Sequence, residues 1–214
     1  MQTHFVCLAN SLKEGGRCIA GIELDMHNKP VFYDGKPKWI RPVCNTEHGE
    51  VPIHIAFPFD LLDIIKLDVI ESKPSHFQTE NVNFNMNTIE KVGSFDQNEL
   101  KHLCDDRISL FGNRGKAVSQ ESIHNLNHSL ALLSVNNFSV FEKIYPDKPN
   151  RPQIRISFEY NGSIYDVPVT DPMFRDKFAM NKNILKDIKQ VYLCTSLGIL
   201  WEGWYHKLCA GIIY

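Results

Sequence analysis

Short runs in which hydrophobic and polar residues alternate dominate this chain, and helical periodicity is rare. His4–Leu8, Arg17–Leu24 and Lys38–Val43 are rich in Val, Ile, Phe or Trp and are bounded by turn-forming residues, which predicts strands. In Asp60–Glu71, charged residues alternate with aliphatic ones from Lys66 onward, which also predicts a strand, although the first part fits a helix.

The clearest local signal lies in Gln153–Val169, where Asn161-Gly162 separates two alternating runs. An Asn-Gly pair between such runs predicts a β-hairpin, because both turn residues must adopt positive φ. Two short helices are predicted by their N-terminal capping patterns. One is Asp96–Cys104, and the other is Met173–Phe178 after Asp171-Pro172.

Many short strands and few helices predict an all-β fold, either a barrel or a sandwich. The length of 214 residues accommodates two small Greek-key barrels. The glycine-containing stretch Arg107–Ser122 is the expected boundary between them. We therefore expect a first barrel over residues 1–115 and a second over residues 116–214.

Two segments at opposite ends of the chain resemble each other. Val6–Ile22 and Val191–Ile212 each contain an apolar run, an expected Ser-Leu turn with glycines, and a run that begins at Arg17 or Lys207 and includes Ala-Gly-Ile. Such self-similarity suggests a duplicated unit, with chance as the alternative because there are only two copies. A tandem duplication would place the segments at the start of each half. The second unit is therefore permuted, or the terminal strands lie side by side in one barrel.

The charge is unevenly distributed although the formal net charge is only −2. Residues 1–106 carry 10 Lys and Arg against 16 Asp and Glu, whereas residues 107–214 carry 13 against 9. The near-neutral total argues against indiscriminate affinity for polyanions. The C-terminal half is the better candidate for contacts with phosphate, and two solvated faces with an incidental imbalance are the alternative.

Nothing in the sequence suggests a membrane or a secretory route. No apolar run approaches the roughly 18 residues that span a bilayer, and no signal peptide is visible, so we expect a cytoplasmic protein. Cys7, Cys18, Cys194 and Cys209 lie in apolar, strand-like runs, which favours buried free thiols over disulfides.

The expected Ser-Leu turns are the first candidate binding site. Glycine-containing loops expose backbone N–H groups to a phosphate or a base edge, and nearby hydroxyls and cations add contacts. The alternative is that these glycines only permit tight turns and that the cations face solvent. The candidate residues of these turns are Asn10, Ser11, Lys13, Arg17, Ser196, Gly198 and Lys207.

Aromatic residues next to cations are the second candidate set. Trp39 and Arg41 lie two residues apart, as do Tyr205 and Lys207, so each pair shares one side of a strand. That spacing suits base stacking plus phosphate binding, and it equally suits a core aromatic beside a snorkelling cation. The core interpretation is favoured for Trp39 and Tyr205. Trp204, with Trp201, lies in a predicted loop and is a surface candidate.

The sequence contains no recognisable catalytic motif, so we predict no catalytic residue. His102, Cys104, His124 and His128 match no common zinc module, and we predict no metal and no cofactor. Asp105 and Asp106 could supply paired carboxylates for magnesium, but adjacent residues on a helix or strand do not point together, and a polar helix C-terminus is the alternative.

Six motifs give the chain a resemblance to the dual-OB domain family of bacterial proteins. They are Leu8-Ala9-Asn10-Ser11, Gly15-Gly16-Arg17-Cys18-Ile19-Ala20-Gly21, Trp39-Ile40-Arg41-Pro42-Val43, Ser196-Leu197-Gly198, Glu202-Gly203 and Tyr205-His206-Lys207-Leu208. The resemblance implies two OB-like barrels and nucleic-acid binding in a defence or conflict system, with no known catalytic motif. Ile199-Leu200-Trp201 departs from the more polar, proline-containing turn expected of the family.

Three hypotheses follow. The first is a non-catalytic protein that binds nucleic acid or a nucleotide-derived ligand. The second is an adaptor that uses the barrel surfaces, with Trp201 and Trp204 as anchors, to bind the product of a neighbouring gene. The third is a metal-dependent hydrolase that uses Asp105 and Asp106.

Overall fold

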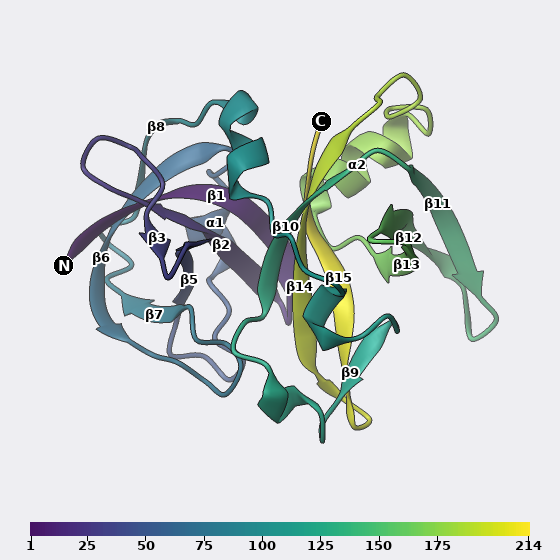
Figure 1. The fold of residues 1–214 in the computed structure, drawn as a ribbon, viewed down its shortest axis with the longest axis horizontal. Helices are drawn as coiled ribbons and strands as arrows, with labels where there is room; N and C mark the ends of the chain where they lie inside the picture. Colours follow the sequence, from purple (N-terminus) through teal and green to yellow (C-terminus); the bar gives the residue numbers. More distant parts are fainter. The chain divides into compact units, whose positions relative to one another are not determined.

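Strands account for 52% of the residues and helices for 12%, which confirms the prediction of a mostly β protein (Figure 1). The computed structural model describes the whole chain of 214 residues except for the side chain of Lys148. The chain divides into two units, Met1–Asp105 and Asp106–Tyr214. Residues 106–115, placed in the first barrel on sequence grounds, thus fall within the second unit.

The first unit consists of eight strands, one short α-helix and one 3-10 helix. They are β1 (Gln2–Lys13), β2 (Gly16–Leu24), β3 (Phe32–Tyr33), β4 (Lys36–Pro37), β5 (Trp39–Val43), α1 (Ile53–Ala56), β6 (Asp63–Ser72), β7 (Asn81–Phe84), β8 (Glu90–Ser94) and η1 (Gln97–Leu103).

Five of these strands close into a barrel in the order β1-β2-β5-β7-β6, because β6 also pairs with β1. β5 and β7 run parallel, and every other neighbouring pair in the barrel is antiparallel. Helix α1 connects the third and fourth barrel strands along the chain. A five-stranded Greek-key barrel is the architecture of the OB fold.

The barrel interior is apolar and tightly packed. Phe5, Ile19 and Ile65 are completely buried, and they belong to three different barrel strands. At Gly21 the backbones approach so closely that a Cβ would lie 1.7 Å from the carbonyl oxygen of Val6. Only glycine therefore allows β2 to pass β1 at this point.

The second unit consists of seven strands, one α-helix and two 3-10 helices. They are η2 (Leu110–Gly112), β9 (Ala117–Ser119), η3 (Ile123–Asn125), β10 (Leu130–Val135), β11 (Phe138–Tyr145), β12 (Lys148–Tyr160), β13 (Ser163–Pro168), α2 (Pro172–Met180), β14 (Val191–Trp201) and β15 (Trp204–Ile213).

Two sheets form this unit, one with the order β10-β14-β15-β9 and one with the order β11-β12-β13. A parallel bridge between Val169 and Cys209 connects the end of β13 to β15. The sheets curl into a half-barrel, in contrast to the closed barrel of the first unit. Phe158 and Tyr165 stack in its core, with ring centroids 5.6 Å apart.

The two terminal hairpins, β1–β2 and β14–β15, have equivalent pairings. Leu12 pairs with Arg17 and Leu197 with Lys207, and each hairpin contains a β-bulge. Outside the hairpins, the neighbouring strands also correspond. In the first unit, β2 pairs with β5 and β1 pairs with β6. In the second unit, β15 pairs with β9 and β14 pairs with β10. The hairpin precedes these partners in the first unit and follows them in the second. The strand order of the second unit is therefore that of the permuted alternative.

The expected Ser-Leu turns are wrong, because both dipeptides lie within strands. The chain turns instead at Glu14-Gly15 and Glu202-Gly203, where both residues of each pair have positive φ. This geometry matches the twist of the flanking strands and requires a glycine, which Ser-Leu does not offer. The Asn161-Gly162 turn has the same geometry and is confirmed.

The other local predictions are largely confirmed. Asp171 caps α2 by accepting a hydrogen bond from the amide of Phe174, and Asp63–Ser72 is a strand throughout. Asp96 also caps a helix as predicted, but the element is a 3-10 helix. All six cysteines are free thiols.

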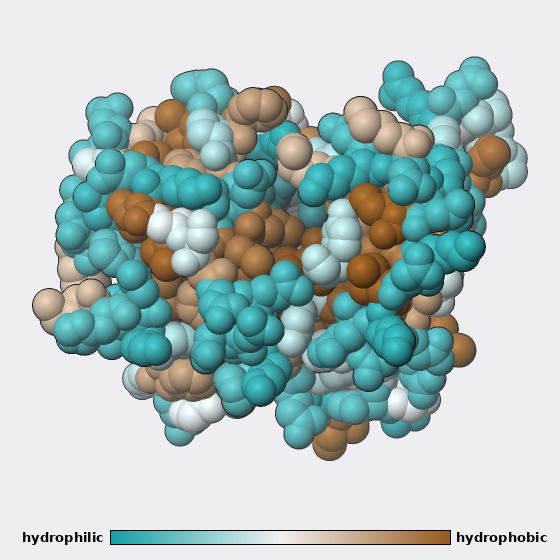
Figure 2. Space-filling model, turned by 90° about the horizontal axis from the view of Figure 1, so that it is seen from above, coloured by the Kyte–Doolittle hydropathy of each residue, from teal (hydrophilic) through white to brown (hydrophobic). Residues whose placement is uncertain are grey.

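Most apolar side chains are buried, yet some reach the surface. Figure 2 shows hydrophobic residues (brown) in patches among hydrophilic ones on one face of the molecule. No helix in the described part of the chain has both the length and the apolar character needed to cross a membrane.

Candidate nucleic-acid interface

The far end of the β14–β15 hairpin exposes two tryptophans. Trp201 and Trp204 flank the Glu202-Gly203 turn and pair directly across the hairpin. Their exposed fractions are 63% and 49%, which is unusual for such large apolar side chains. Directly paired residues lie on the same face of a sheet, so the two indoles form one surface, here called the tryptophan platform.

A hollow of about 620 Å³ adjoins the platform. It lies where the segment after β9 meets the hairpin, and the amide of Gln120 donates a hydrogen bond of 2.9 Å to the carbonyl of Gly203. The volume lies in the range of small-ligand pockets, about 300–1,000 Å³. The residues that line it are Ser119, Gln120, Glu121, His124, Gly203 and Trp204.

By strand pairing, the hollow adjoins strands that correspond to the second and third strands of an OB barrel. In an OB barrel, oligonucleotides bind on the face of the second and third strands and on the loop between the first and second. By the pairing equivalence, β15 corresponds to the second strand and β9 to the third. The Glu202-Gly203 turn corresponds to the loop between the first and second strands.

Lys207 lies on the same strand as the platform but faces the interior. Its side chain is 1% exposed, whereas Trp204 and His206 are exposed. The Nζ atom donates hydrogen bonds to the carbonyl oxygen and the Oδ1 of Asn113, at 2.7 and 3.0 Å, and lies 5.0 Å from the centre of the Tyr165 ring. Burial lowers the pKa of Lys207 to about 8.

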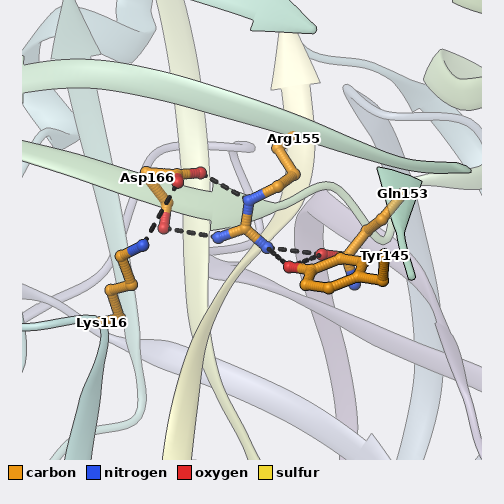
Figure 3. Close-up of polar contacts among 5 residues, drawn as sticks. All are labelled: Lys116, Tyr145, Gln153, Arg155 and Asp166. Atoms are coloured by element: carbon orange, nitrogen blue, oxygen red, sulfur yellow. Dashed lines mark hydrogen bonds and ion pairs between the residues drawn. The ribbon is translucent and has the colours of Figure 1, made fainter. Parts of the chain in front are cut away.

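A second buried cation, Arg155, connects the strands of the smaller sheet (Figure 3). Its Nε donates to Oδ1 of Asp166 on β13 at 2.6 Å, and Nη1 reaches Gln153 and Tyr145. Lys116, just before β9, also contacts Asp166 at 3.4 Å. Burial opposes ionisation of Asp166, but the hydrogen bond and charge of Arg155 keep its pKa below the ordinary value.

Asn10 and Arg41 of the first unit, which were predicted to bind a ligand, form contacts within the protein. Asn10 donates from Nδ2 to the carbonyls of Ala56 and Phe59, at 2.9 and 2.7 Å, and so connects β1 to the end of α1. Arg41 is 2% exposed and forms a 3.1 Å ion pair with the equally enclosed Glu80.

The remaining predicted residues of the first unit differ in exposure. Ser11 and Arg17 are buried, and Arg17 contacts the carbonyl of Asn10 through Nη1 at 3.5 Å. Lys13 is half-buried at the end of β1, and this burial lowers its pKa. Trp39 is also half-buried, at the start of β5.

In the second unit, most of the predicted residues support the hairpin itself. Ser196 is buried and donates to the carbonyl of Leu197, and a Cβ at Gly198 would lie 3.2 Å from the Leu208 side chain. Tyr205 is half-buried opposite Val118. Of the predicted set, only Trp204 lines the hollow.

The predicted residues are therefore divided between the two units. Asn10, Ser11, Lys13, Arg17, Trp39 and Arg41 belong to the first, and Ser196, Gly198, Trp204, Tyr205 and Lys207 belong to the second. Ser119, Gln120 and Glu121 line the hollow and were not predicted, because they lie in a stretch interpreted as a loop boundary. His124 was considered only as a zinc ligand. No three His, Cys, Asp or Glu residues of the described chain are grouped as a metal site.

Comparison with known families gives one match. A family model described as a dual OB-containing domain matches residues 3–212, and so covers both units. Among curated proteins, none matches the sequence.

Proposed function

The chain belongs to the dual OB-containing domain family, and on that premise we propose that it is a non-catalytic protein that binds nucleic acid. The contact surface is the tryptophan platform with its adjoining hollow. One observation carries the proposal: two exposed tryptophans are paired on the face that OB barrels use for oligonucleotides. The biological setting that we propose is a bacterial defence or conflict system.

Single-stranded nucleic acid suits this surface best. Unpaired bases expose their faces, and stacking on an aromatic side chain is worth about 1–3 kcal/mol per base. Ser119, Gln120 and His124 place hydrogen-bonding groups beside the platform, within reach of base edges. In a duplex the base faces are stacked on one another, so the platform would have no access to them.

The charge of the second unit agrees with a ligand that carries phosphates. Residues 106–214 contain 13 Lys and Arg against 10 Asp and Glu. Arg114 and Lys116 are exposed on the segment that leads into β9, whose last residue, Ser119, lines the hollow. Lys116 forms an ion pair with Asp166 and Lys207 faces the interior, so we assign the phosphate contact of this segment to Arg114.

Titration by fluorescence anisotropy tests the proposal. Labelled single-stranded DNA, single-stranded RNA and duplex DNA are compared at two salt concentrations, and affinity for a single strand should fall as salt rises. Trp204→Ala should weaken that affinity at least about fivefold, the equivalent of losing one stacked base. The matched control is Tyr33→Ala, which removes an aromatic ring that is 79% exposed in the first unit. Absence of binding to any of the three nucleic acids contradicts the proposal. Equal affinity of Trp204→Ala and Tyr33→Ala for the single strand would contradict it as well.

An adaptor function is the second candidate, because exposed tryptophans are also typical anchors of protein interfaces. Glu121 and Glu202 lie beside the platform and disfavour phosphates at that point. A stable complex with the product of a neighbouring gene, resistant to nuclease and high salt and lost on Trp204→Ala, would favour it. A metal-dependent hydrolase based on Asp105 and Asp106 stays a prediction.

A further inference from the structure

Strand β11 is an edge strand of the second unit. The sheet order is β11-β12-β13, so among the described strands β11 pairs only with β12. Figure 1 shows β11 along the outer side of this unit. An edge strand presents a row of backbone N–H and C=O groups that another extended chain can pair with.

The register shows which backbone groups face outward. The amide of Glu159 on β12 donates to the carbonyl of Asn137 at 3.0 Å, and Phe138 stands opposite Phe158. Residues of an antiparallel pair alternate between hydrogen-bonded and non-hydrogen-bonded positions. Because Asn137 is hydrogen-bonded to β12, Val140 directs its N–H and C=O away from β12, toward the free edge.

A hollow of about 310 Å³ lies beside the first residues of β11. Phe138, Ser139 and Val140 all line it. Successive residues of a strand point to opposite faces, so a hollow that touches three in a row follows the edge rather than one face. The opposite wall is the segment after α2, where Lys186 and Ile188 line the hollow.

The charged residues that line this hollow are both basic. They are Lys182 and Lys186, and no acidic residue is among its described lining residues. Lys182 is already occupied, since its Nζ contacts Glu142 at 2.5 Å and lies 4.7 Å from the centre of the Phe178 ring. Lys186 is exposed and forms no ion pair with a described residue, so its charge is available to an incoming anion.

We propose that this groove docks an extended, acidic segment of a partner protein, which adds as a strand to the free edge of β11. This mode of recognition combines main-chain hydrogen bonds with side-chain pockets. The outward edge offers carbonyl acceptors as well as amide donors, a pattern that matches the backbone of a polypeptide. Lys182 also covers Phe178, which removes that ring as a surface for stacking bases. The inference is independent of the nucleic-acid function of the tryptophan platform.

Three labelled probes test the proposal by anisotropy: a heptapeptide that alternates Val and Glu, its counterpart with Lys in place of Glu, and a 15-nucleotide oligo-deoxythymidine. The acidic peptide should bind and the basic peptide should not. Lys186→Glu should weaken acidic-peptide binding about fivefold, as loss of one exposed ion pair does. The matched control, Lys189→Glu, changes the net charge equally in the same segment but at a residue outside the hollow, and should have little effect.

Val140→Pro isolates the contribution of the strand edge. Proline is tolerated where the N–H of an edge strand faces solvent, and it removes one main-chain donor. It should weaken acidic-peptide binding about fivefold. Should this variant fail to fold, hydrogen exchange of the wild-type protein gives the same information. The amide of Val140 should then become protected when the acidic peptide is added.

Each contrary outcome overturns the proposal. If Lys186→Glu and Lys189→Glu weaken acidic-peptide binding equally and Val140→Pro has no effect, the peptide is held by nonspecific electrostatic attraction. Unchanged exchange of the Val140 amide would exclude strand addition. Displacement of the peptide by the oligonucleotide, together with sensitivity of oligonucleotide binding to Lys186→Glu, would make the groove a nucleic-acid site. Absence of peptide binding would remove the docking function.

Discussion

The two terminal hairpins share a pairing pattern and end differently. The β1–β2 hairpin turns one pair after Leu12 and Arg17. The β14–β15 hairpin continues past its equivalent pair, Leu197 and Lys207, and ends in two exposed tryptophans. The scaffold is thus retained in both units, and the candidate binding surface is an extension of one copy. Permutation of the strand order leaves this hairpin geometry unchanged.

Two buried cations, one in each unit, have partners of different charge. In the first, Arg41 pairs with the carboxylate of Glu80. In the second, Lys207 is bound by the neutral oxygens of Asn113. A carboxylate left behind in the interior is far more costly than an unpaired amide or carbonyl oxygen. The two sites should therefore respond differently to loss of the cation.

Arg41→Ala should have the largest effect on stability. It removes the ion-pair partner of the buried Glu80 carboxylate, so we expect the free energy of unfolding to fall by about 3–5 kcal/mol. Lys38→Ala is the matched control, because Lys38 forms an ion pair with Glu23 at the surface and should contribute only about 0–1 kcal/mol. Urea titrations of both variants measure the difference. Similar midpoints for the two variants would contradict the assignment of Arg41 to a structural ion pair.

Local turn and capping chemistry was predictable from sequence, and long-range partners were not. Asn161-Gly162 and Asp171 were correctly identified because each acts on residues next to it. Glu14-Gly15 and Glu202-Gly203 adopt the same turn but were missed, since glutamate rarely takes positive φ and gives no turn signal.

The candidate site shows the same limit. Lys207 looked like a phosphate contact, but its partner, Asn113, lies 94 residues away and turns the charge inward. The hollow beside Trp204 depends on residues 119–124, which only the pairing of β9 with β15 places there. The resemblance between the two ends of the chain left two arrangements open, namely a permuted second unit or terminal strands side by side in one barrel. The pairing of β9 with β15 favours the permuted second unit.

Lys207→Met should be less costly than Arg41→Ala, and its effect should depend on pH. The variant removes the charged donor to both Asn113 oxygens, which keep only the bonds from the Gly115 amide at 2.8 Å and the Tyr165 hydroxyl at 3.4 Å. We expect a loss of about 1–3 kcal/mol near pH 7. The pKa of Lys207 is lowered to about 8 from 10.5, so between these values the unfolded chain holds more protons than the folded one. Stability conferred by this group therefore rises with pH across that window.

The measurement is the difference in unfolding free energy between wild type and Lys207→Met. The unfolding free energy of the wild type should rise relative to that of the variant from pH 8 to pH 10, because only the wild type has the titrating amine. The cysteines and tyrosines are common to both proteins, so their titration cancels to first order. A difference that is constant with pH, or that moves the other way, would contradict a lowered pKa.

The smallest effect is expected at the tryptophan platform itself. Trp201 and Trp204 are exposed and directly paired across the hairpin, so we expect each to contribute to stability no more than a cross-strand pair does. A double-mutant cycle with Trp201→Ala and Trp204→Ala should give a coupling of about 0.2–1 kcal/mol in unfolding. Loss of several kcal/mol in either single variant would mean that the indoles support the core, and the weaker nucleic-acid binding expected of Trp204→Ala would then reflect damage to the fold. A small coupling leaves both rings available to stack on bases.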